Sequence, residues 1–418
     1  MDKIALEGGV KLSGEIEISG AKNSALPAMS ASLLTRGKSV IGNVPKLRDI
    51  NTFVKVLEHL GAKVRWIEGN SIEIDTSSVN CFEAPYDLVR TMRASVLVLG
   101  PLVSRYGRAK ISLPGGCAIG ARPVNFHIRA MEQLGADINL ENGYIDALAK
   151  GLKGCRIVFD TVTVTGTANV LMASAIAEGE TVIENAAKEP EIVDLCGILK
   201  AMGARISGEG TETIKITGTS ELSPFEWNVI PDRIETLTFV IAGAITGGDI
   251  IVKRCNPSHS ATVIDKLRET GVEIIEGDNY LDVKGNGQIL ASDIKTAPYP
   301  GFATDMQAQF MALMTLCEGA SVISETVFEN RFMHVAELIR MGAQIKVDGH
   351  TAVVKGVAEL KGAPVMATDL RASASLILAG LAAEGETVIS RVYHIDRGYE
   401  NIEEKLSKAG AKIKRIYS

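Results

Sequence analysis

Residues 338–345 read L-I-R-M-G-A-Q-I, and this short pattern recurs along the whole chain. A large apolar residue is followed by three further positions, a glycine, a small residue, any residue, and then Val or Ile. Each copy is typical of an amphipathic helix that ends at a C′ glycine and is followed at once by a strand. The six glycines, spaced by 68 to 74 residues, are Gly61, Gly135, Gly203, Gly271, Gly342 and Gly410.

A second pattern keeps the same period. A helix rich in Ala, Ser and Met, such as A-S-A-S-L-I-L-A-G-L-A (372–382), ends at a glycine and precedes a β-branched strand. These glycines are Gly37, Gly107, Gly179, Gly248, Gly319 and Gly385. The two patterns predict an α/β protein of six βαβαβ-type repeats of about 70 residues, arranged as two domains of three repeats. The narrow, apolar helices should pack inside a shell of sheets.

The composition is that of an ordinary globular chain, with 46% hydrophobic and 22% charged residues among 418. No apolar run reaches the roughly 20 residues of a membrane-spanning helix, and the N-terminus lacks the apolar core of a signal peptide. The six cysteines and six histidines are scattered without metal-ligand spacing, so we expect no disulfide, metal or cofactor, and a cytoplasmic location. The net charge of −6 argues against nucleic-acid binding but permits a few arginines to hold an anionic ligand.

Charged side chains recur where loops enter helices. Free N–H groups and the helix dipole favour anions at such entrances, and arginines beside them are typical of phosphate and carboxylate sites. Each could instead be a surface residue or a helix cap, and Asp232, Asp369 and Asp396 are expected to be N-caps or arginine partners. The residues that suggest an anion-binding cleft are Lys22, Asn23, Arg90, Arg93, Arg122, Arg331, Arg371 and Arg397.

The sharpest departure from the repeat is S-L-P-G-G-C-A-I-G-A-R-P-V-N-F-H (112–127), which contains Cys117. The two repeat glycines that flank this segment are 28 residues apart, against 23 to 25 in the other repeats. The extra residues include glycines, which permit a mobile lid. Arg122 and His127 could lower the pKa of the thiol and make it reactive. The alternative is that Cys117 is only a small residue in a turn, with no part in catalysis.

Nine motifs, in order along the chain, carry a resemblance to a known family. They are S-G-A-K-N-S-A-L-P, T-M-R-A-S, L-P-G-G-C-A-I-G-A-R-P-V, K-E-P-E-I-V-D, P-D-R-I-E-T, T-D-M-Q-A-Q-F, F-E-N-R-F-M-H-V, T-D-L-R-A-S-A-S and H-I-D-R-G-Y-E. Through them the sequence resembles the UDP-N-acetylglucosamine enolpyruvyl transferases over essentially its full length. The resemblance implies two inside-out α/β domains of three repeats each, with the active site between them. It also implies an N-terminal catalytic-loop domain of residues 22–230 and a C-terminal domain of residues 1–21 plus 231–418.

The resemblance further implies an activity and its substrates. This family transfers the enolpyruvyl group of phosphoenolpyruvate to the 3-hydroxyl of the sugar in UDP-N-acetylglucosamine and releases phosphate, the first committed step of peptidoglycan synthesis. No metal or cofactor, nucleic acid or membrane insertion is implied. The residues implied to hold phosphoenolpyruvate are Lys22, Asn23, Arg122 and Arg397. The residues implied to contact UDP-N-acetylglucosamine are Arg93, Arg122, Pro123, Val124, Asn125, Phe126, Thr161, Val162, Thr163, Val164, Asp305 and Val327.

The catalytic residues implied by the resemblance are Cys117, Asp305, Lys22 and Arg397. Cys117 matches the cysteine that can add to phosphoenolpyruvate and that the epoxide fosfomycin alkylates, and it could serve as an acid. Addition and elimination also need a base for the sugar hydroxyl, which Asp305 could supply. Lys22 and Arg397 would offset the negative charge of the ligand. Since Asp305 precedes the helical run M-Q-A-Q-F-M-A-L-M, it could equally be a helix cap.

Two alternatives to this function stay open at this point. The sister enolpyruvyl transferases of aromatic biosynthesis share the fold and phosphoenolpyruvate, but we know of no counterpart there of the segment around Cys117. A non-catalytic repeat scaffold, or a relative that processes RNA ends, belongs to another class, and the acidic balance disfavours it. Within the resemblance, Asn125 and Phe126 stand where Asp-Leu is frequent, and Thr165 stands where glycine is usual, which bears on the uridine contacts.

Overall fold

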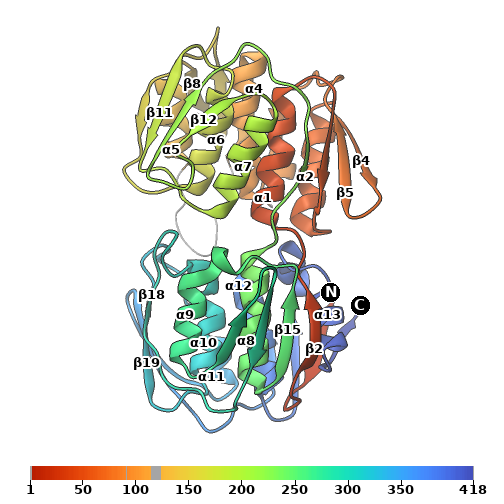
Figure 1. Cartoon of the computed structure of the whole chain (residues 1–418), viewed down its shortest axis with the longest axis vertical. Helices are drawn as coiled ribbons and strands as arrows, with labels where there is room; N and C mark the ends of the chain where they lie inside the picture. The colour runs from red at the N-terminus through yellow and green to blue at the C-terminus, as the bar shows by residue number, and fades with distance from the viewer. Residues whose placement is uncertain (1, 91, 114–123, 418) are drawn as a thin grey trace. The chain divides into compact units, whose positions relative to one another are not determined.

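The structure, a computed structural model, describes residues 2–90, 92–113 and 124–417. The chain folds into two compact units. The described residues between Gly20 and Ile230 form the N-terminal unit, and the C-terminal unit combines the segment up to Ser19 with the segment from Pro231 onward. Figure 1 shows the red N-terminal strands within the unit that also contains the blue C-terminus. The described chain therefore passes between the units near residue 20 and near residue 230.

The described strands form six four-stranded sheets, three in each unit. In spatial order, those of the N-terminal unit are β14 (Glu226–Asn228), β3 (Lys38–Gly42), β5 (Ser71–Asp75) and β4 (Lys63–Ile67); β6 (Glu83–Ala84), β7 (Arg108–Ser112), β9 (Tyr144–Leu148) and β8 (Asp137–Glu141); and β10 (Arg156–Val158), β11 (Glu180–Glu184), β13 (Thr213–Thr217) and β12 (Arg205–Ser207). Those of the C-terminal unit are β2 (Ser13–Glu17), β15 (Asp249–Lys253), β17 (Tyr280–Lys284) and β16 (Glu273–Glu276); β18 (Ile294–Lys295), β19 (Ala320–Ser324), β21 (Thr351–Lys355) and β20 (Gln344–Asp348); and β22 (Pro364–Met366), β23 (Glu386–Ser390), β1 (Lys3–Glu7) and β24 (Lys412–Ile416).

All six sheets have the same construction. The first strand of each order is parallel to the second, and the remaining pairs are antiparallel. In one sheet, for example, Ile323 of β19 lies opposite Ile294 of β18 and opposite Ala352 of β21. Buried and exposed residues alternate along β19, so one face of the sheet packs on the helices.

In each unit, one strand of a sheet comes directly before the first helix of the other unit along the chain. β2 precedes the first helix of the N-terminal unit along the chain, yet it pairs with β15 of the C-terminal unit (Figure 1). β14 precedes the first helix of the C-terminal unit, yet it pairs with β3 of the N-terminal unit. In the last sheet, β1 lies between β23 and β24, so the two ends of the chain close the sixth repeat together.

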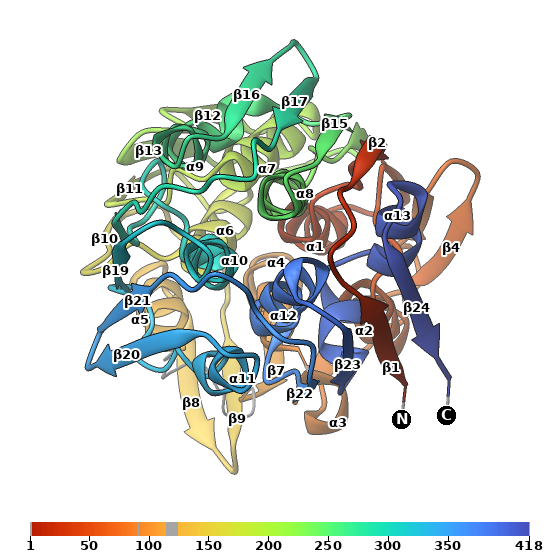
Figure 2. The same cartoon turned by 90° about the horizontal axis from the view of Figure 1, so that it is seen from below.

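The first helix of each repeat is the more buried one. These inner helices are α1 (Lys22–Ala31), α4 (Leu99–Tyr106), α6 (Val164–Ser174), α8 (Arg233–Thr246), α10 (Gln307–Met314) and α12 (Leu370–Ala382). Outer helices are α2 (Arg48–His59), α5 (Asn125–Gln133), α7 (Pro190–Ala201), α9 (Ala261–Glu269), α11 (Val335–Arg340) and α13 (Ile402–Lys408). Shorter turns are α3 (Tyr86–Val89), η1 (Ser32–Leu34), η2 (Arg93–Val98), η3 (Pro257–Ser260), η4 (Thr304–Met306) and η5 (Val392–Arg397). Figure 2 shows α8, α10 and α12 grouped at the centre of their unit, with strands around them.

Small residues in the inner helices permit this close packing. A Cβ atom built on Gly380 of α12 would lie 2.8 Å from the Leu6 side chain of β1. One built on Gly243 of α8 would lie 2.8 Å from the Ile250 side chain of β15. Because real Cβ contacts are longer than this, larger residues would push the helices away from their sheets. The predicted α/β architecture, with two inside-out sets of three repeats around buried helices, is confirmed.

The predicted helix-ending glycines are confirmed for the first pattern, but in the second pattern only Gly107 caps its helix. The prediction is wrong for α6, α10 and α12, which end at Ser174, Met314 and Ala382, before the predicted glycines. All six glycines of the first pattern have a positive φ, between 88° and 112°, as a C′ position requires. In the second pattern Gly248 was predicted to end α8, but Gly247 does so with φ 61°. Gly248 instead passes close to the backbone of Leu12, where a Cβ atom would lie 2.3 Å from the carbonyl oxygen.

Candidate active site

Lys22, a predicted phosphoenolpyruvate contact, is the first residue of α1. Its Nζ atom lies 3.2 Å from Oδ2 of Asp49, in the first turn of α2, and both side chains are largely buried. The ion pair therefore fixes the ammonium group at the entrance of an inner helix. Asn23, which follows Lys22, is exposed at the same entrance.

His127 joins the entrances of three helices in the N-terminal unit. Its Nδ1 atom lies 2.8 Å from the amide nitrogen of Asn169, and its Nε2 atom lies 3.3 Å from the Thr165 hydroxyl. Since an amide nitrogen only donates, Nδ1 accepts and the ring proton is on Nε2. The Asn169 side chain also bonds to the backbone of Val96 and Gly100. We call the hydrogen-bonded group of His127, Thr165 and Asn169 the His127 junction. It connects the start of α5 to α6 and to the η2–α4 segment.

The junction gathers eight of the predicted UDP-sugar contacts. Phe126 packs edge-on against Phe159, with ring centroids 6.3 Å apart, beside the loop that leads into α6. Thr163 is the N-cap of α6, and its hydroxyl accepts a 3.2 Å hydrogen bond from the backbone of Gly166. The residues at these neighbouring entrances are Arg93, Val124, Asn125, Phe126, Thr161, Val162, Thr163 and Val164.

His127 cannot play the role that the sequence suggested for it. Burial, and then the charge of Arg93, lower the pKa of the ring to about 4. The ring is therefore neutral near pH 7 and supplies no positive charge that would lower the pKa of a thiol. The interpretation of His127 as a positive charge that activates a thiol is wrong, because the side chain is enclosed between α5 and α6. Cys117 itself lies outside the described residues, as do Arg122 and Pro123.

Four of the five described cysteines are poor nucleophiles. Burial raises the pKa of Cys155 and Cys317, and it raises the pKa of Cys255 to about 11. The pKa of Cys196 is raised to about 12, first by burial and then by Glu209. The thiolate is the reactive form, so little of any of these four is reactive at neutral pH. The fifth, Cys81, is half-buried, with its sulfur 3.9 Å from Nε2 of His59.

Asp305, in η4 of the C-terminal unit, is held by two arginines. Nη2 of Arg331 donates to Oδ1 at 2.6 Å, and Nη2 of Arg371 donates to Oδ2 at 2.8 Å. Both arginine side chains are only 5% exposed, and that of Asp305 is 28% exposed. The carboxylate is thus the accessible member of a buried ionic cluster.

The cluster decides the charge state of Asp305. Burial acts to raise the pKa of its carboxyl, but the charges and hydrogen bonds of Arg371 and Arg331 outweigh burial and hold this pKa well below its ordinary value. The alternative interpretation of Asp305 as a helix cap is wrong, because the N-cap of η4 is Ala303 and no side chain caps it. The arginines, which come from two other segments, take up both carboxylate oxygens.

Three residues that the sequence did not single out hold Arg371 in place. Its Nη1 atom donates at 3.2 Å to the hydroxyl of Tyr399, which lies 2.8 Å from the hydroxyl of Thr238. Gln309 donates to the same tyrosine at 3.2 Å and to the backbone oxygen of Asp305 at 2.9 Å. All three supporting side chains are buried. Gln309 lies in the motif T-D-M-Q-A-Q-F, Tyr399 lies in H-I-D-R-G-Y-E, and Thr238 follows P-D-R-I-E-T by two residues. Their place in or beside these motifs was the sequence signal that could have identified them.

The remaining charged positions of this unit have separate roles. Asp232 and Asp369 are the N-caps of α8 and α12, each accepting two backbone hydrogen bonds. Asp396 is an arginine partner, with two hydrogen bonds from Arg415 at 2.6 and 3.0 Å. These predictions are confirmed. Arg397 ends η5, which packs on α12, and is half-buried.

Val327 lies in the loop that follows β19 and leads to Arg331. Its backbone N–H donates at 2.8 Å to Glu325, and the ring of the next residue, Phe328, lies 5.2 Å from the Arg331 guanidinium. The loop is therefore attached to the Asp305 cluster. The described structure thus brings Asp305 and Val327 together in the C-terminal unit, while Lys22 and the eight UDP-sugar positions belong to the N-terminal unit.

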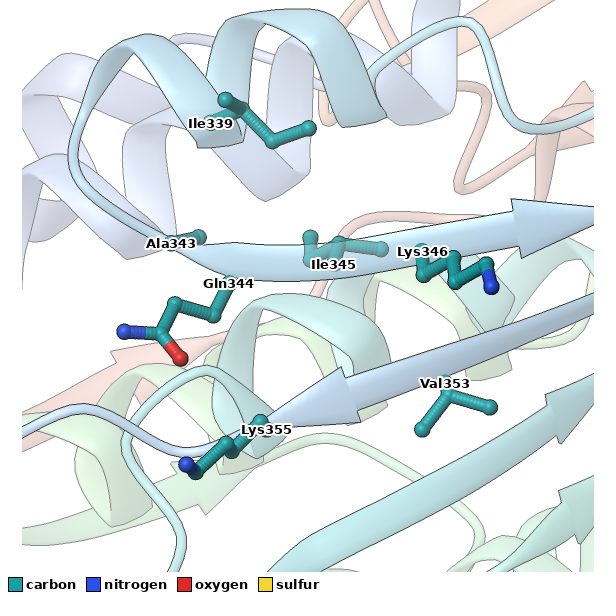
Figure 3. A pocket seen from close by; sticks show the side chains of 7 residues that line it. All are labelled: Ile339, Ala343, Gln344, Ile345, Lys346, Val353 and Lys355. Carbon is teal, nitrogen blue, oxygen red and sulfur yellow. The ribbon is translucent and has the colours of Figure 1, made fainter.

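A surface hollow elsewhere contains no predicted site residue. It has a volume of about 370 Å³ and is bordered by α11, β20 and β21 (Figure 3). Its lining residues are Ile339, Ala343, Gln344, Ile345, Lys346, Val353 and Lys355. Among the described residues there is no group of three or more His, Cys, Asp or Glu side chains arranged to hold a metal. None of the described helices combines the length and apolar character needed to cross a membrane.

Comparison with known proteins places these features in a family. Residues 6–406 match the family described as EPSP synthase (3-phosphoshikimate 1-carboxyvinyltransferase). Proteins named UDP-N-acetylglucosamine 1-carboxyvinyltransferase from Geobacter metallireducens and Geotalea uraniireducens are 61% and 60% identical over 416 residues, covering 100% of both chains.

Solved structures agree on the fold. The enolpyruvyl transferase NikO from Streptomyces tendae matches with a TM-score of 0.90 and 27% identity, covering 100% of this chain and 99% of that one. EPSP synthase from Acinetobacter baumannii matches with a TM-score of 0.77 over 100% of both chains. Its identity of 18% supports the fold alone.

Proposed function

The chain belongs to the UDP-N-acetylglucosamine 1-carboxyvinyltransferases, and we propose that residues at the helix entrances of both units carry out its chemistry. The reaction is the transfer of the enolpyruvyl group from phosphoenolpyruvate to the sugar 3-hydroxyl of UDP-N-acetylglucosamine, with release of phosphate. This is the first committed step of peptidoglycan synthesis. The observation that carries the proposal is 61% identity over the full chain, against 18% to an EPSP synthase that shares only the fold.

Asp305 is the proposed base for the sugar hydroxyl. In the described state its carboxylate is paired with Arg331 and Arg371, which makes it a weak proton acceptor. Phosphoenolpyruvate carries both a carboxylate and a phosphate, so it can compete for these guanidinium groups. Drawing either arginine towards the ligand would raise the pKa of Asp305 and allow it to accept a proton. The same carboxylate would stabilise positive charge at the central carbon.

The N-terminal unit is proposed to hold most of the nucleotide sugar. The support is the junction around His127, which places the entrances of α5 and α6 side by side with Arg93. Thr165 takes part in this junction, so its presence where the family usually has glycine adds a contact to His127 without removing a helix entrance. Asn125 and Phe126 begin α5 and are proposed to face the uridine.

Phosphoenolpyruvate is proposed to lie against Lys22, Asn23, Arg122 and Arg397. Lys22 is already fixed by Asp49 at a helix entrance, where backbone N–H groups also favour a phosphate. Cys117 is proposed to protonate the methylene carbon or to assist product release. We place the reaction in the cytoplasm, in keeping with the free thiols of the five described cysteines.

One experiment tests the function directly. The full chain is incubated with phosphoenolpyruvate, and phosphate release is followed with UDP-N-acetylglucosamine, with 3-phosphoshikimate, or with neither. We expect release that depends strictly on UDP-N-acetylglucosamine. Release with 3-phosphoshikimate instead would assign the chain to the sister activity, and no release with either acceptor would refute the proposal.

A further inference from the structure

Two of the six repeats differ from the other four at one position, the residue that directly follows the strand after the inner helix. In four repeats this residue has a left-handed backbone, with φ between 54° and 59°: Asn43, Asn185, Arg254 and Arg391. The two exceptions are Leu113, which leads to the segment that contains Cys117, and Glu325, which follows β19. Departures from a repeat mark the places where chemistry or its support is built in.

Glu325 is completely buried, at 0% exposure, and hydrogen bonds satisfy its carboxylate. Oε1 accepts from the Thr296 hydroxyl at 2.9 Å and from the backbone N–H groups of Val327 and Phe328 at 2.8 and 3.1 Å. Oε2 accepts from the Thr304 hydroxyl at 2.8 Å. No described lysine, arginine or histidine lies within ion-pair distance of it. A buried carboxylate that is costly to desolvate is thus used only to hold hydroxyl and backbone groups.

A relay of hydrogen bonds leads from this carboxylate to Asp305. The Thr304 hydroxyl has one proton, which it gives to Glu325, so it presents a lone pair on its other side. That lone pair accepts from Nη1 of Arg331 at 2.8 Å. Nη2 of the same guanidinium donates to Asp305 at 2.6 Å. The orientation of Arg331 against Asp305 is therefore determined from the side that Glu325 occupies.

We propose that Glu325 is a positioning residue for the enolpyruvyl transfer, acting through two separate arms. One arm passes through Thr304 and Arg331 and sets the geometry of Asp305. The other holds the N–H groups of Val327 and Phe328 and so fixes the turn implied to contact the nucleotide sugar. The inference rests on the proposed roles of Asp305 and Val327. It adds that one buried side chain couples catalytic geometry to sugar binding.

Three variants separate the arms. Thr304→Val cuts only the link to Arg331. In Glu325→Gln the amide oxygen can still accept from Val327 and Phe328, while its NH2 group, which only donates, faces Thr304. Both variants should lower kcat roughly ten- to hundredfold, as small misplacements of catalytic groups do, and leave the KM for UDP-N-acetylglucosamine unchanged. Glu325→Ala loses both arms and should also raise this KM roughly tenfold.

The control is Ser321→Ala. Ser321 is a fully buried residue of β19 whose hydroxyl donates to the backbone of Ser292 and has no link to Glu325. Loss of the Ser321 hydroxyl should lower the unfolding free energy, as Thr304→Val does, but should leave kcat and KM unchanged. The double variant Glu325→Gln with Thr304→Val should be no slower than the slower single variant, because both cut one link.

The inference is overturned if Thr304→Val and Glu325→Gln lose stability but keep wild-type kcat, as the control does, or if their effects on kcat multiply. It is distinguishable from failure of the proposed function. If the wild-type chain releases no phosphate with UDP-N-acetylglucosamine, both proposals are refuted. If the wild type is active and only the variants behave like the control, the positioning role alone is refuted.

Discussion

Nη2 of Arg371 lies 2.8 Å from Oδ2 of Asp305, although 66 positions separate the two residues along the chain. Arg331 holds the other oxygen of the same carboxylate at 2.6 Å. The two guanidinium groups hold the pKa of this carboxyl well below its usual range, although burial opposes them. The group proposed to accept a proton is therefore anchored, and its activation requires the arginines to change partners.

Asp305→Asn should reduce both turnover and stability. An amide cannot accept the proton of the sugar hydroxyl, so kcat should fall by a factor on the order of a hundred or more. The substitution also leaves two buried guanidinium groups without their carboxylate. Because 28% of the Asp305 side chain is exposed, we expect a loss of at most about 3 kcal/mol of unfolding free energy, the low end for a broken buried pair. Phosphate release and urea unfolding measure the two effects.

A true cap provides the control for that variant. Asp232 accepts hydrogen bonds from the backbone of Ile234 and Glu235 at the start of α8. Asn caps a helix about as well as Asp, so Asp232→Asn should leave the unfolding free energy nearly unchanged. If the Asp305→Asn variant kept a near-normal kcat, the base would have to be another residue, whether or not the variant had lost stability.

The contrast between these two aspartates shows what the sequence can and cannot predict. Glycine-ended helices and the strands after them are local features, so their period predicted six repeats and inner helices from the residues alone. Asp305 lies in η4, Arg331 in the turn before α11 and Arg371 in the first turn of α12, and only the folded C-terminal unit brings them into one cluster. Local sequence therefore allowed Asp305 to be a cap or a base, and it could not choose between them.

The same limit explains the wrong predictions. His127 reads as a loop neighbour of Cys117, but Asn169, 42 positions away, draws its ring into the contact between α5 and α6. Gly247 and Gly248 are adjacent, and only the approach of Leu12 from the N-terminal segment shows which of them ends the helix. Both boundaries between the domains came from the resemblance, whereas the pairing of β2 with β15 and of β14 with β3 became evident only in the structure.

Lys22→Met should separate the binding role of the ammonium group from its structural one. Removing the charge paired with the largely buried Asp49 should weaken phosphoenolpyruvate binding at least roughly tenfold, seen as a higher KM, and should lower the unfolding free energy. Adding Asp49→Asn removes the second charge of the pair. The double variant should keep the high KM, because the ammonium group is still absent. Recovery of KM together with stability would show that Lys22 serves only the fold.

His127 makes a prediction about pH. Its folded pKa of about 4 lies below the ordinary value of about 6.5, so the unfolded chain binds more protons between these limits. The stabilising contribution is complete above pH 6.5 and is lost as pH falls towards 4. His127→Gln should therefore flatten the dependence of the unfolding free energy on pH between pH 6.5 and 4, by at most about 1.4 kcal/mol per pH unit, with the largest change near pH 5.

The matched control for this measurement is His59→Gln. His59 lies in the same unit, at the end of α2, and its side chain is exposed. Urea unfolding of this variant at the same pH values measures what the loss of an exposed imidazole does, and the change in His127→Gln is compared with it. An unchanged slope in His127→Gln would mean that the ring has the same pKa in the folded and the unfolded chain, and the argument that burial keeps it from acting on a thiol through charge would have to be withdrawn.

Cys117 should be the single thiol that fosfomycin modifies. The other candidates are disfavoured because burial raises the pKa of Cys155 and Cys317, and the pKa values of Cys196 and Cys255 reach about 12 and 11. Mass spectrometry of the treated chain should show one added molecule, located on the peptide that contains Cys117. Cys81→Ser, which removes the remaining half-buried thiol, should be labelled as the wild type is.

Two substitutions at the same position decide what the thiol does. Cys117→Ser should lose turnover, because a hydroxyl is a much weaker acid than a thiol at neutral pH. Cys117→Asp should keep activity and resist fosfomycin, because a carboxylic acid can still donate a proton but attacks the epoxide less readily. If Cys117→Ser retained normal turnover, Cys117 would be a bystander that the epoxide happens to reach. Labelling of Cys255 or Cys317 in place of Cys117 would refute the assignment of the reactive thiol altogether, because burial leaves both with little thiolate to react.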